Sequence, residues 1–159
     1  MESNLYFFMN DDTLELFLRL SLAMLLGGLL GIERTLAGKT AGMRTYALIS
    51  MGASLFVIIS EVVGRSLGAV SFDPLRMASQ IVVGIGFIGA GMIILKEDKV
   101  MGLTTSAGLW VAAGIGTAVG FGLYALSVFA TSLTLFVFLI LWFMEKKLKK
   151  TGSYHNEGE

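Results

Sequence analysis

Long apolar stretches without charge alternate with short charged segments along this chain, a pattern that predicts membrane-crossing helices. A helix needs roughly 20 mostly apolar residues to cross about 30 Å of hydrocarbon. Five stretches approach or meet that length: Leu14–Ile32, Thr45–Ser60, Met77–Leu95, Leu103–Val119 and Leu123–Phe143. The last two come from one stretch, Val100–Met144, which contains no Asp, Glu, Lys or Arg and is too long for a single span.

Glycine marks the expected break in that stretch, because Gly120-Phe121-Gly122 can end one helix before the next begins. We therefore predict an all-α integral membrane bundle of five transmembrane helices over residues 14–144. A bundle of four helices is the alternative.

Basic residues between the spans predict the orientation, since Lys and Arg are enriched in cytoplasmic loops. With five spans, the 33–44 loop, the 96–99 loop and the C-terminal tail share one side and carry most of these residues; Arg65 and Arg76 lie on the other. We expect residues 1–13 outside and the basic-then-acidic tail, 145–159, in the cytoplasm of a bacterial cell. Four spans would separate the 33–44 loop from the C-terminal lysines.

Composition agrees with a lipid environment and excludes several functions. Hydrophobic residues make up 55% of the chain, charged residues 15%, and the mean hydropathy is +0.76; soluble domains have about 45–50% apolar and about 25% charged residues. The net charge of +0 does not favour nucleic-acid binding. Without cysteine, and with His155 as the one histidine, thiol and zinc-thiolate chemistry are excluded and no enzyme is predicted.

Glycines at helical spacing predict close helix packing, because small residues let membrane helices approach each other. The positions expected to pack are Gly27, Gly31, Gly84, Gly86, Gly89, Gly91, Gly116 and Gly120. The 84–91 segment also matches the GxGxxG dinucleotide pattern, which we reject because no strand precedes it. An alternative is a broken helix whose carbonyl groups face an ion. The glycine-rich faces further predict a homodimer.

Two groups of polar residues are candidate sites. At the outer face these are Asp73, Arg76 and Gln80, with Glu61 and Arg65 as possible contributors; at the inner face they are Glu33, Arg34, Arg44, Thr45, Thr104 and Thr105. Ordinary roles compete with function here: Asp73 can cap a helix, Thr104 or Thr105 can cap another, and basic ends orient the spans. The inner group could instead bind an anionic headgroup, a phosphate or a partner protein.

Acidic residues lie only at the edges of spans two to five, which gives little support to a mid-membrane cation pathway. Glu15 and Arg19, four residues apart in the first span, are expected to neutralise each other. No cofactor is predicted, although Mg²⁺ stays open.

Three blocks of sequence resemble the membrane domain of the MgtC/SapB family of bacterial inner-membrane proteins. They are GIER at 31–34 with AGKTAGMRT at 37–45; Asp73-Pro74, Arg76, QIV at 80–82 and GIGFIGAG at 84–91; and GLTTSAGLW at 102–110. By this resemblance, eight residues of the two polar groups match the family's polar motif positions: Glu33, Arg34, Arg44, Asp73, Arg76, Gln80, Thr104 and Thr105. The resemblance implies a multi-span protein of the short SapB type, without the C-terminal ACT-like domain of longer members.

The resemblance also implies a role in growth under magnesium limitation and, in virulence-linked members, binding of the F-type ATP synthase. We expect a non-enzymatic regulator that acts through contacts with other membrane proteins. The alternatives are a protein that binds or transports magnesium or another ion, and an enzyme acting on a lipid headgroup.

Overall fold

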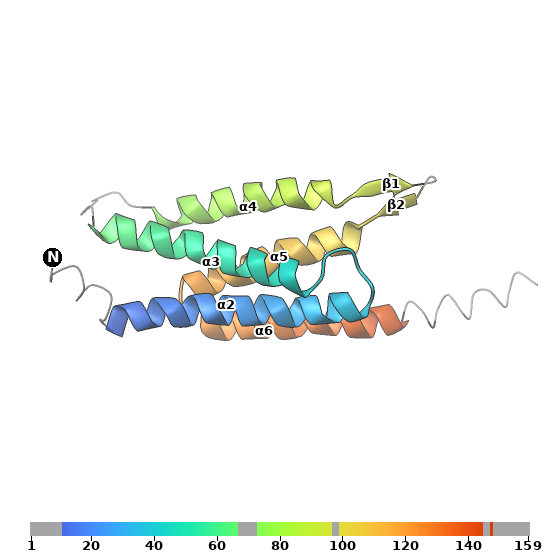
Figure 1. Cartoon of the computed structure of the whole chain (residues 1–159), viewed down its shortest axis with the longest axis horizontal. Coiled ribbons are helices and arrows are strands. Elements are labelled where there is room, and N and C mark those ends of the chain that lie inside the picture. The colour runs from blue at the N-terminus through green and yellow to red at the C-terminus, as the bar shows by residue number, and fades with distance from the viewer. Residues whose placement is uncertain (1–10, 67–72, 97–98, 145–146, 148–159) are drawn as a thin grey trace, which may run out of the picture.

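The computed structural model describes residues 11–66, 73–96, 99–144 and 147 and shows helices lying side by side (Figure 1). The helices are α2 (Asp11–Leu36), α3 (Met43–Ser66), α4 (Pro74–Gly91), α5 (Leu103–Gly120) and α6 (Tyr124–Phe136), which continues into a π-helix, η1 (Val137–Leu141). Two short strands, β1 (Ile94–Lys96) and β2 (Lys99–Met101), join α4 to α5. The helical bundle predicted from the sequence is confirmed.

Four of these helices are long and apolar enough to cross a membrane: Thr13–Leu36, Met43–Gly64, Leu103–Gly120 and Tyr124–Met144. The apolar part of α4, Leu75–Gly91, is shorter. It nevertheless runs alongside α3 and α5 for most of the length of the bundle (Figure 1). Of the expected terminal segments, 1–13 and 145–159, residues 1–10, 145–146 and 148–159 lie outside the described residues, and Asp11 already begins α2.

The third predicted span is wrong at its C-terminal end. Helix α4 ends at Gly91 rather than Leu95, and Ile94–Lys96 pairs with Lys99–Met101 as an antiparallel hairpin. Gly102 makes this return possible, because its φ is +89° and a Cβ there would collide with the Met92 carbonyl oxygen. Apolar β-branched residues after a helix fit a strand as well as a span, so hydropathy alone could not separate the two.

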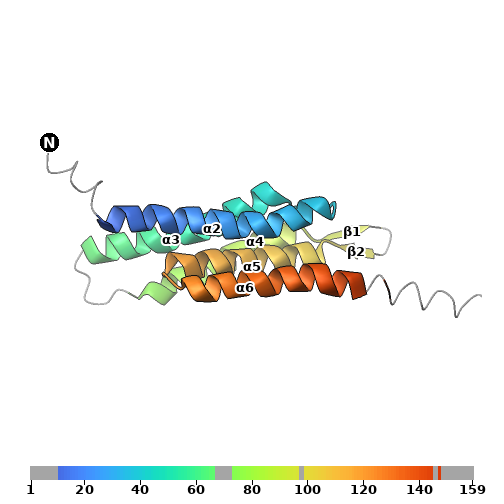
Figure 2. The same cartoon turned by 90° about the horizontal axis from the view of Figure 1, so that it is seen from below.

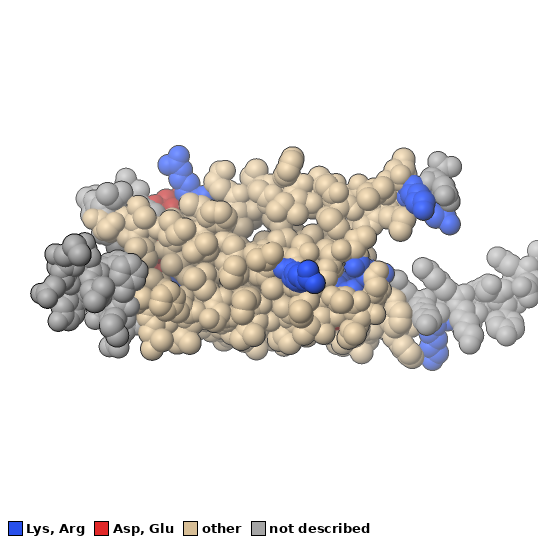
Figure 3. All heavy atoms as spheres, in the orientation of Figure 1, with Lys and Arg blue, Asp and Glu red and all other residues tan. Residues whose placement is uncertain are grey.

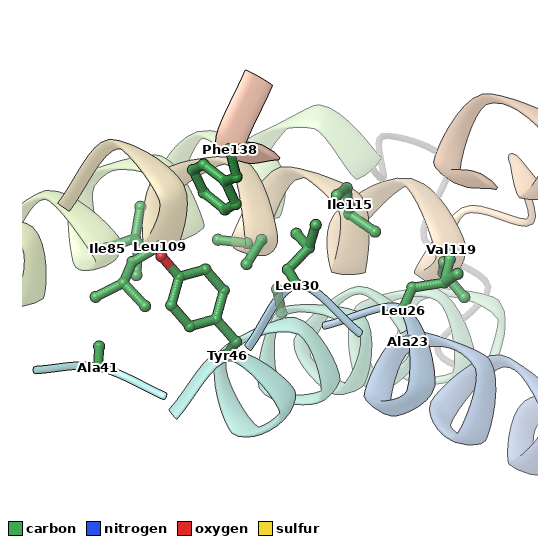
Figure 4. Close-up of a cluster of buried hydrophobic side chains, with 13 residues drawn as sticks. Ala23, Leu26, Leu30, Ala41, Tyr46, Ile85, Leu109, Ile115, Val119 and Phe138 are labelled. Carbon is green, nitrogen blue, oxygen red and sulfur yellow. The ribbon is translucent and has the colours of Figure 1, made fainter. Parts of the chain in front are cut away.

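Helix α5 is the centre of the bundle and packs against α2, α3, α4 and α6 (Figure 2). The buried core joins side chains from all of these helices, among them Leu30, Tyr46, Ile85, Leu109 and Phe138 (Figure 4). The predicted break between α5 and α6 is confirmed: Gly122 adopts a φ of +76° in the turn. The two helices therefore return antiparallel to each other.

The outside of the bundle is apolar, as a lipid environment requires. Large hydrophobic side chains lie exposed along every helix, and Phe87 of α4 is 85% exposed. On the face shown in Figure 3, uncharged residues cover most of the molecule, and most of the visible Lys and Arg side chains lie toward the end that carries the hairpin. A water-soluble domain would not expose so large an apolar surface.

Candidate functional site

Arg34 is a buried cation at the end of the bundle where α2 meets η1. Its side chain is only 3% exposed. Its Nε donates to the Glu33 carboxylate, and its guanidinium lies over the ring of Phe138, with 3.6 Å between Cζ and the ring centroid. This desolvated cation is therefore held by one carboxylate and one aromatic face.

Tyr46 extends this arrangement from α3 to α5. Its fully buried hydroxyl donates to the Thr105 carbonyl oxygen at 3.3 Å. Gly108 leaves the room for it, because a Cβ there would collide with the Tyr46 hydroxyl and the Phe138 ring. Tyr46 and Phe138 thus meet at Gly108, Arg34 lies over Phe138 and Thr105 accepts from Tyr46; we call these four residues, with Glu33, the inner cluster.

The other residues predicted for the inner face do not join this cluster. Arg44 and Thr104 are exposed, and Thr45 is half-buried. The expected capping by Thr104 or Thr105 is wrong: Gly102 is the N-cap of α5, and its carbonyl accepts from Ser106 N at 2.8 Å. The backbone at the helix start is left-handed, with a φ of +89°, which favours glycine as the N-cap and leaves the two threonines inside the first turn.

A second charged cluster, which sequence reasoning saw only in part, surrounds Arg19 at the opposite end. Arg19 pairs with Glu15 at 2.5 Å, as expected, but also with Glu61 of α3 at 3.0 Å. It further donates to the Tyr124 hydroxyl at 3.2 Å and to the Gly120 carbonyl at 2.9 Å. One guanidinium therefore connects α2, α3, the end of α5 and the start of α6.

The signal for this cluster was present in the sequence. A basic residue inside one predicted span and an acidic residue at the end of the next lie at similar depth, and ionisable groups in membranes pair with one another. Glu61 therefore belongs with Arg19 and not with Asp73, the residue beside which the sequence pattern placed it. The side chain of Arg65, the other suggested contributor, lies outside the described residues.

The predicted outer group is not a cluster in the structure. Asp73 is the N-cap of α4, as expected, and its carboxylate accepts from Leu75 N at 3.0 Å. Arg76 and Gln80 are exposed, and no ion pair or hydrogen bond to either side chain is found within the described ranges. They lie one helical turn apart on α4.

Glycines on α2 and α5 lie at close helix crossings. A Cβ at Gly27 would come within 2.5 Å of the Tyr46 carbonyl oxygen, and one at Gly120 within 2.8 Å of the Val57 side chain. A Cβ at Gly31 or Gly116 would collide with the backbone of α3. These four positions allow α3 to lie directly against both neighbouring helices.

Glycines on α4 behave differently. A Cβ at Gly84, Gly86 or Gly91 would meet no atom within 4 Å, and one at Gly89 would touch only Ser106 at 3.8 Å. The predicted close packing is therefore not found for Gly84, Gly86 and Gly91 among the described residues. The segment is also continuous α-helix to Gly91, so the alternative of a broken helix is wrong.

Acidic side chains do not gather around a possible metal ion. No group of three or more His, Cys, Asp or Glu side chains suited to a metal occurs in the described part of the chain. Glu15 and Glu61 bind Arg19, Glu33 binds Arg34, and Asp73 caps α4.

Sequence comparisons place these features in a family. The model of the MgtC family matches residues 20–147. "Putative magnesium transporter YhiD" of Escherichia coli (strain K12) is 45% identical over 128 residues, which are 79% of this chain and 60% of that protein. Protein SrpB of Synechococcus elongatus is 38% identical over 141 residues, which are 83% of this chain and 78% of that protein.

Protein SapB of Bacillus subtilis is 37% identical over 142 residues, 87% of this chain and 60% of SapB. The chain thus spans about 60% of the length of YhiD and of SapB. Because this share is the same for both relatives, length does not distinguish a SapB-like protein from a YhiD-like one. No solved structure matches. The family match covers most of the bundle, including all residues of the inner cluster, and this chain therefore belongs to the MgtC family.

Proposed function

We propose that this chain is a non-enzymatic regulator of the bacterial inner membrane that acts by helix contact with other membrane proteins and is linked to magnesium homeostasis. The observation that carries the proposal is the free face of α4. Gly86 is exposed with open space around it, although a glycine weakens a helix unless it serves a contact. Together with Val83, Phe87 and Ala90, which lie on the same side of α4, it forms an exposed apolar face with a gap at Gly86 where a partner helix can approach.

In the proposed topology the chain crosses the membrane five times. Helix α4 then spans the bilayer despite its shorter apolar part, with residues 1–13 outside and the C-terminus in the cytoplasm. The basic residues of the hairpin, Lys96 and Lys99, fall on the cytoplasmic side. A reporter fused after Lys150 should be cytoplasmic; an extracytoplasmic reporter would overturn this topology.

The partner is proposed to be another membrane protein, and a second copy of the chain is a candidate alongside the F-type ATP synthase that the family resemblance suggests. A photo-reactive aromatic residue in place of Phe87, which is exposed beside Gly86, should form adducts with the partner in the native membrane, while one at Gly114, on α5, serves as the control. Adducts formed equally from both positions, or none from position 87, would contradict the proposal.

Magnesium transport is the second candidate, favoured by the name of the relative YhiD. Transport requires oxygen ligands for a hydrated cation, and Asp73 is the acidic side chain nearest the start of α4. Purified protein in liposomes should move no Mg²⁺ if the regulator proposal holds. A flux that Asp73→Ala abolishes would establish transport instead.

A further inference from the structure

A groove of about 480 Å³ lies between α3 and α4, with Ala113 of α5 at its base. Its walls include Leu48, Gly52 and Phe56 of α3 and Gln80, Gly84 and Ile88 of α4. In Figure 3 the molecule is hollowed along the boundary between these helices. We propose that this groove binds one acyl chain of an anionic phospholipid, whose headgroup is held at the outer end of α4.

Two glycines keep the groove open. A Cβ at Gly52 or Gly84 would meet no atom within 4 Å, whereas Gly27 and Gly116 allow helices to touch. Gly52 and Gly84 lie on opposite walls, and larger side chains at either position would fill the space between α3 and α4. The groove is therefore open because glycines, and not larger side chains, occupy these two positions on its walls.

The size of the groove fits an acyl chain and not a helix. From Met77 to Ile88 the wall of α4 extends about 16 Å, at 1.5 Å per residue. One leaflet contributes half of the roughly 30 Å hydrocarbon layer, which is about 15 Å. A helix at least 10 Å wide would need about 1,300 Å³ over the same length. A helix of a second copy of the chain would therefore not fit inside the groove.

The polar residues at the outer end select the headgroup. Gln80 lines the groove and has no hydrogen-bond partner within the described ranges, and a lone amide in hydrocarbon is costly. It lies about 9 Å along the helix from Pro74, at a depth suited to a lipid ester carbonyl. Arg76, one turn closer to the start of α4, presents a planar guanidinium that matches a phosphate.

Charge complementarity favours an anionic lipid. Helix α4 contains no acidic residue, and the carboxylate of Asp73, its N-cap, accepts from Leu75 N. No ion pair between Asp73 and Arg76 is found among the residues that the structure describes. The cationic charge of Arg76 is therefore available to the phosphate.

Native mass spectrometry of the purified full chain, titrated with phosphatidylglycerol or phosphatidylcholine, tests the proposal. Gly84→Leu should fill the groove and weaken retention of phosphatidylglycerol by roughly tenfold, the effect of about 1.4 kcal/mol. Gly52→Leu should do the same from the opposite wall. Gly86→Leu is the matched control: it adds the same side chain to the same helix, about 200° around the axis from Gly84, and should retain the lipid.

Arg76→Gln tests the headgroup contact separately from the acyl-chain contact. It should remove the preference for phosphatidylglycerol over phosphatidylcholine while an acyl chain still binds in the groove. Equal retention of phosphatidylglycerol by both groove variants and by Gly86→Leu would overturn the proposal. So would a loss of dimers with unchanged lipid retention, since the occupant would then be a second copy. The proposal is independent of the partner surface, because Gly86→Leu should prevent partner adducts and Gly84→Leu should not.

Discussion

The guanidinium of Arg34 stacks on the ring of Phe138 and bonds to Glu33 in the same buried space. The two contacts come from different parts of the chain, because Phe138 belongs to η1 and the carboxylate to α2. The π-helix gives this stretch one additional residue per turn, and such insertions are frequent at functional sites. The inner cluster thus connects η1, at the end of the last helix, to the C-terminal end of α2.

Arg34→Leu should destabilise the bundle by about 3 kcal/mol, because it leaves the Glu33 carboxylate without its cation and removes the stacking on Phe138. Arg34→Lys should recover part of the loss, since Lys keeps the charge but not the planar group. Thermal unfolding in detergent micelles measures both. Arg44→Leu is the control, since Arg44 is exposed, and should leave the midpoint almost unchanged; an equal effect of Arg34→Leu and Arg44→Leu would refute this assignment.

Arg19 and Glu61 should be energetically coupled, because they connect α2 to α3 at 3.0 Å in a partly buried setting. A double-mutant cycle of Arg19→Leu and Glu61→Gln should give a coupling free energy of about 1–2 kcal/mol. The matched cycle of Arg76→Leu and Glu61→Gln should give none, since no contact joins that pair in the described structure. Additive effects in the first cycle would show that the Arg19–Glu61 pair contributes nothing to stability.

Sequence reasoning found the helices because hydropathy and glycine breaks act locally. The turn at Gly122 and the cap at Asp73 were predictable for the same reason, since each depends on its immediate neighbours. The Arg19–Glu61 pair was missed because it joins residues 42 positions apart, and its partners depend on how α2 and α3 align.

Glycine roles were the least predictable part of the site. Gly116 and Gly84 occur in similar apolar, glycine-rich stretches, yet one meets the backbone of α3 and the other meets nothing within 4 Å. The difference arises from which face of each helix points inward, and a helix that is apolar on all sides gives no sequence signal for that face. The β1–β2 hairpin was missed for a related reason: its apolar strands resemble the end of a span.

Gly116→Ala should prevent normal folding or destabilise it severely, because the added methyl group would collide with the Ser50 carbonyl of α3. Gly114→Ala is the matched control on the same helix, where a Cβ meets nothing within 4 Å. It should be neutral or stabilising by about 0.5–1 kcal/mol, the usual gain of Ala over Gly in a helix. Yield of folded protein after detergent extraction and its unfolding midpoint measure both variants. Equal yields and midpoints for the two variants would contradict the close crossing of α3 and α5.

Ser50 and Ser54 carry hydroxyl groups that are fully buried and have no hydrogen-bond partner among the residues that the structure describes. An unsatisfied buried hydroxyl costs about 1–3 kcal/mol, so removing it should relieve a penalty. Ser50→Ala should therefore leave stability unchanged or raise it by about 1 kcal/mol. Ser127→Ala is the control, because Ser127 is equally buried but donates to the Leu123 carbonyl at 2.8 Å, and it should lose about 1 kcal/mol. If chemical unfolding in micelles shows Ser50→Ala to be as damaging as Ser127→Ala, the Ser50 hydroxyl has a partner in the membrane, such as a bound water.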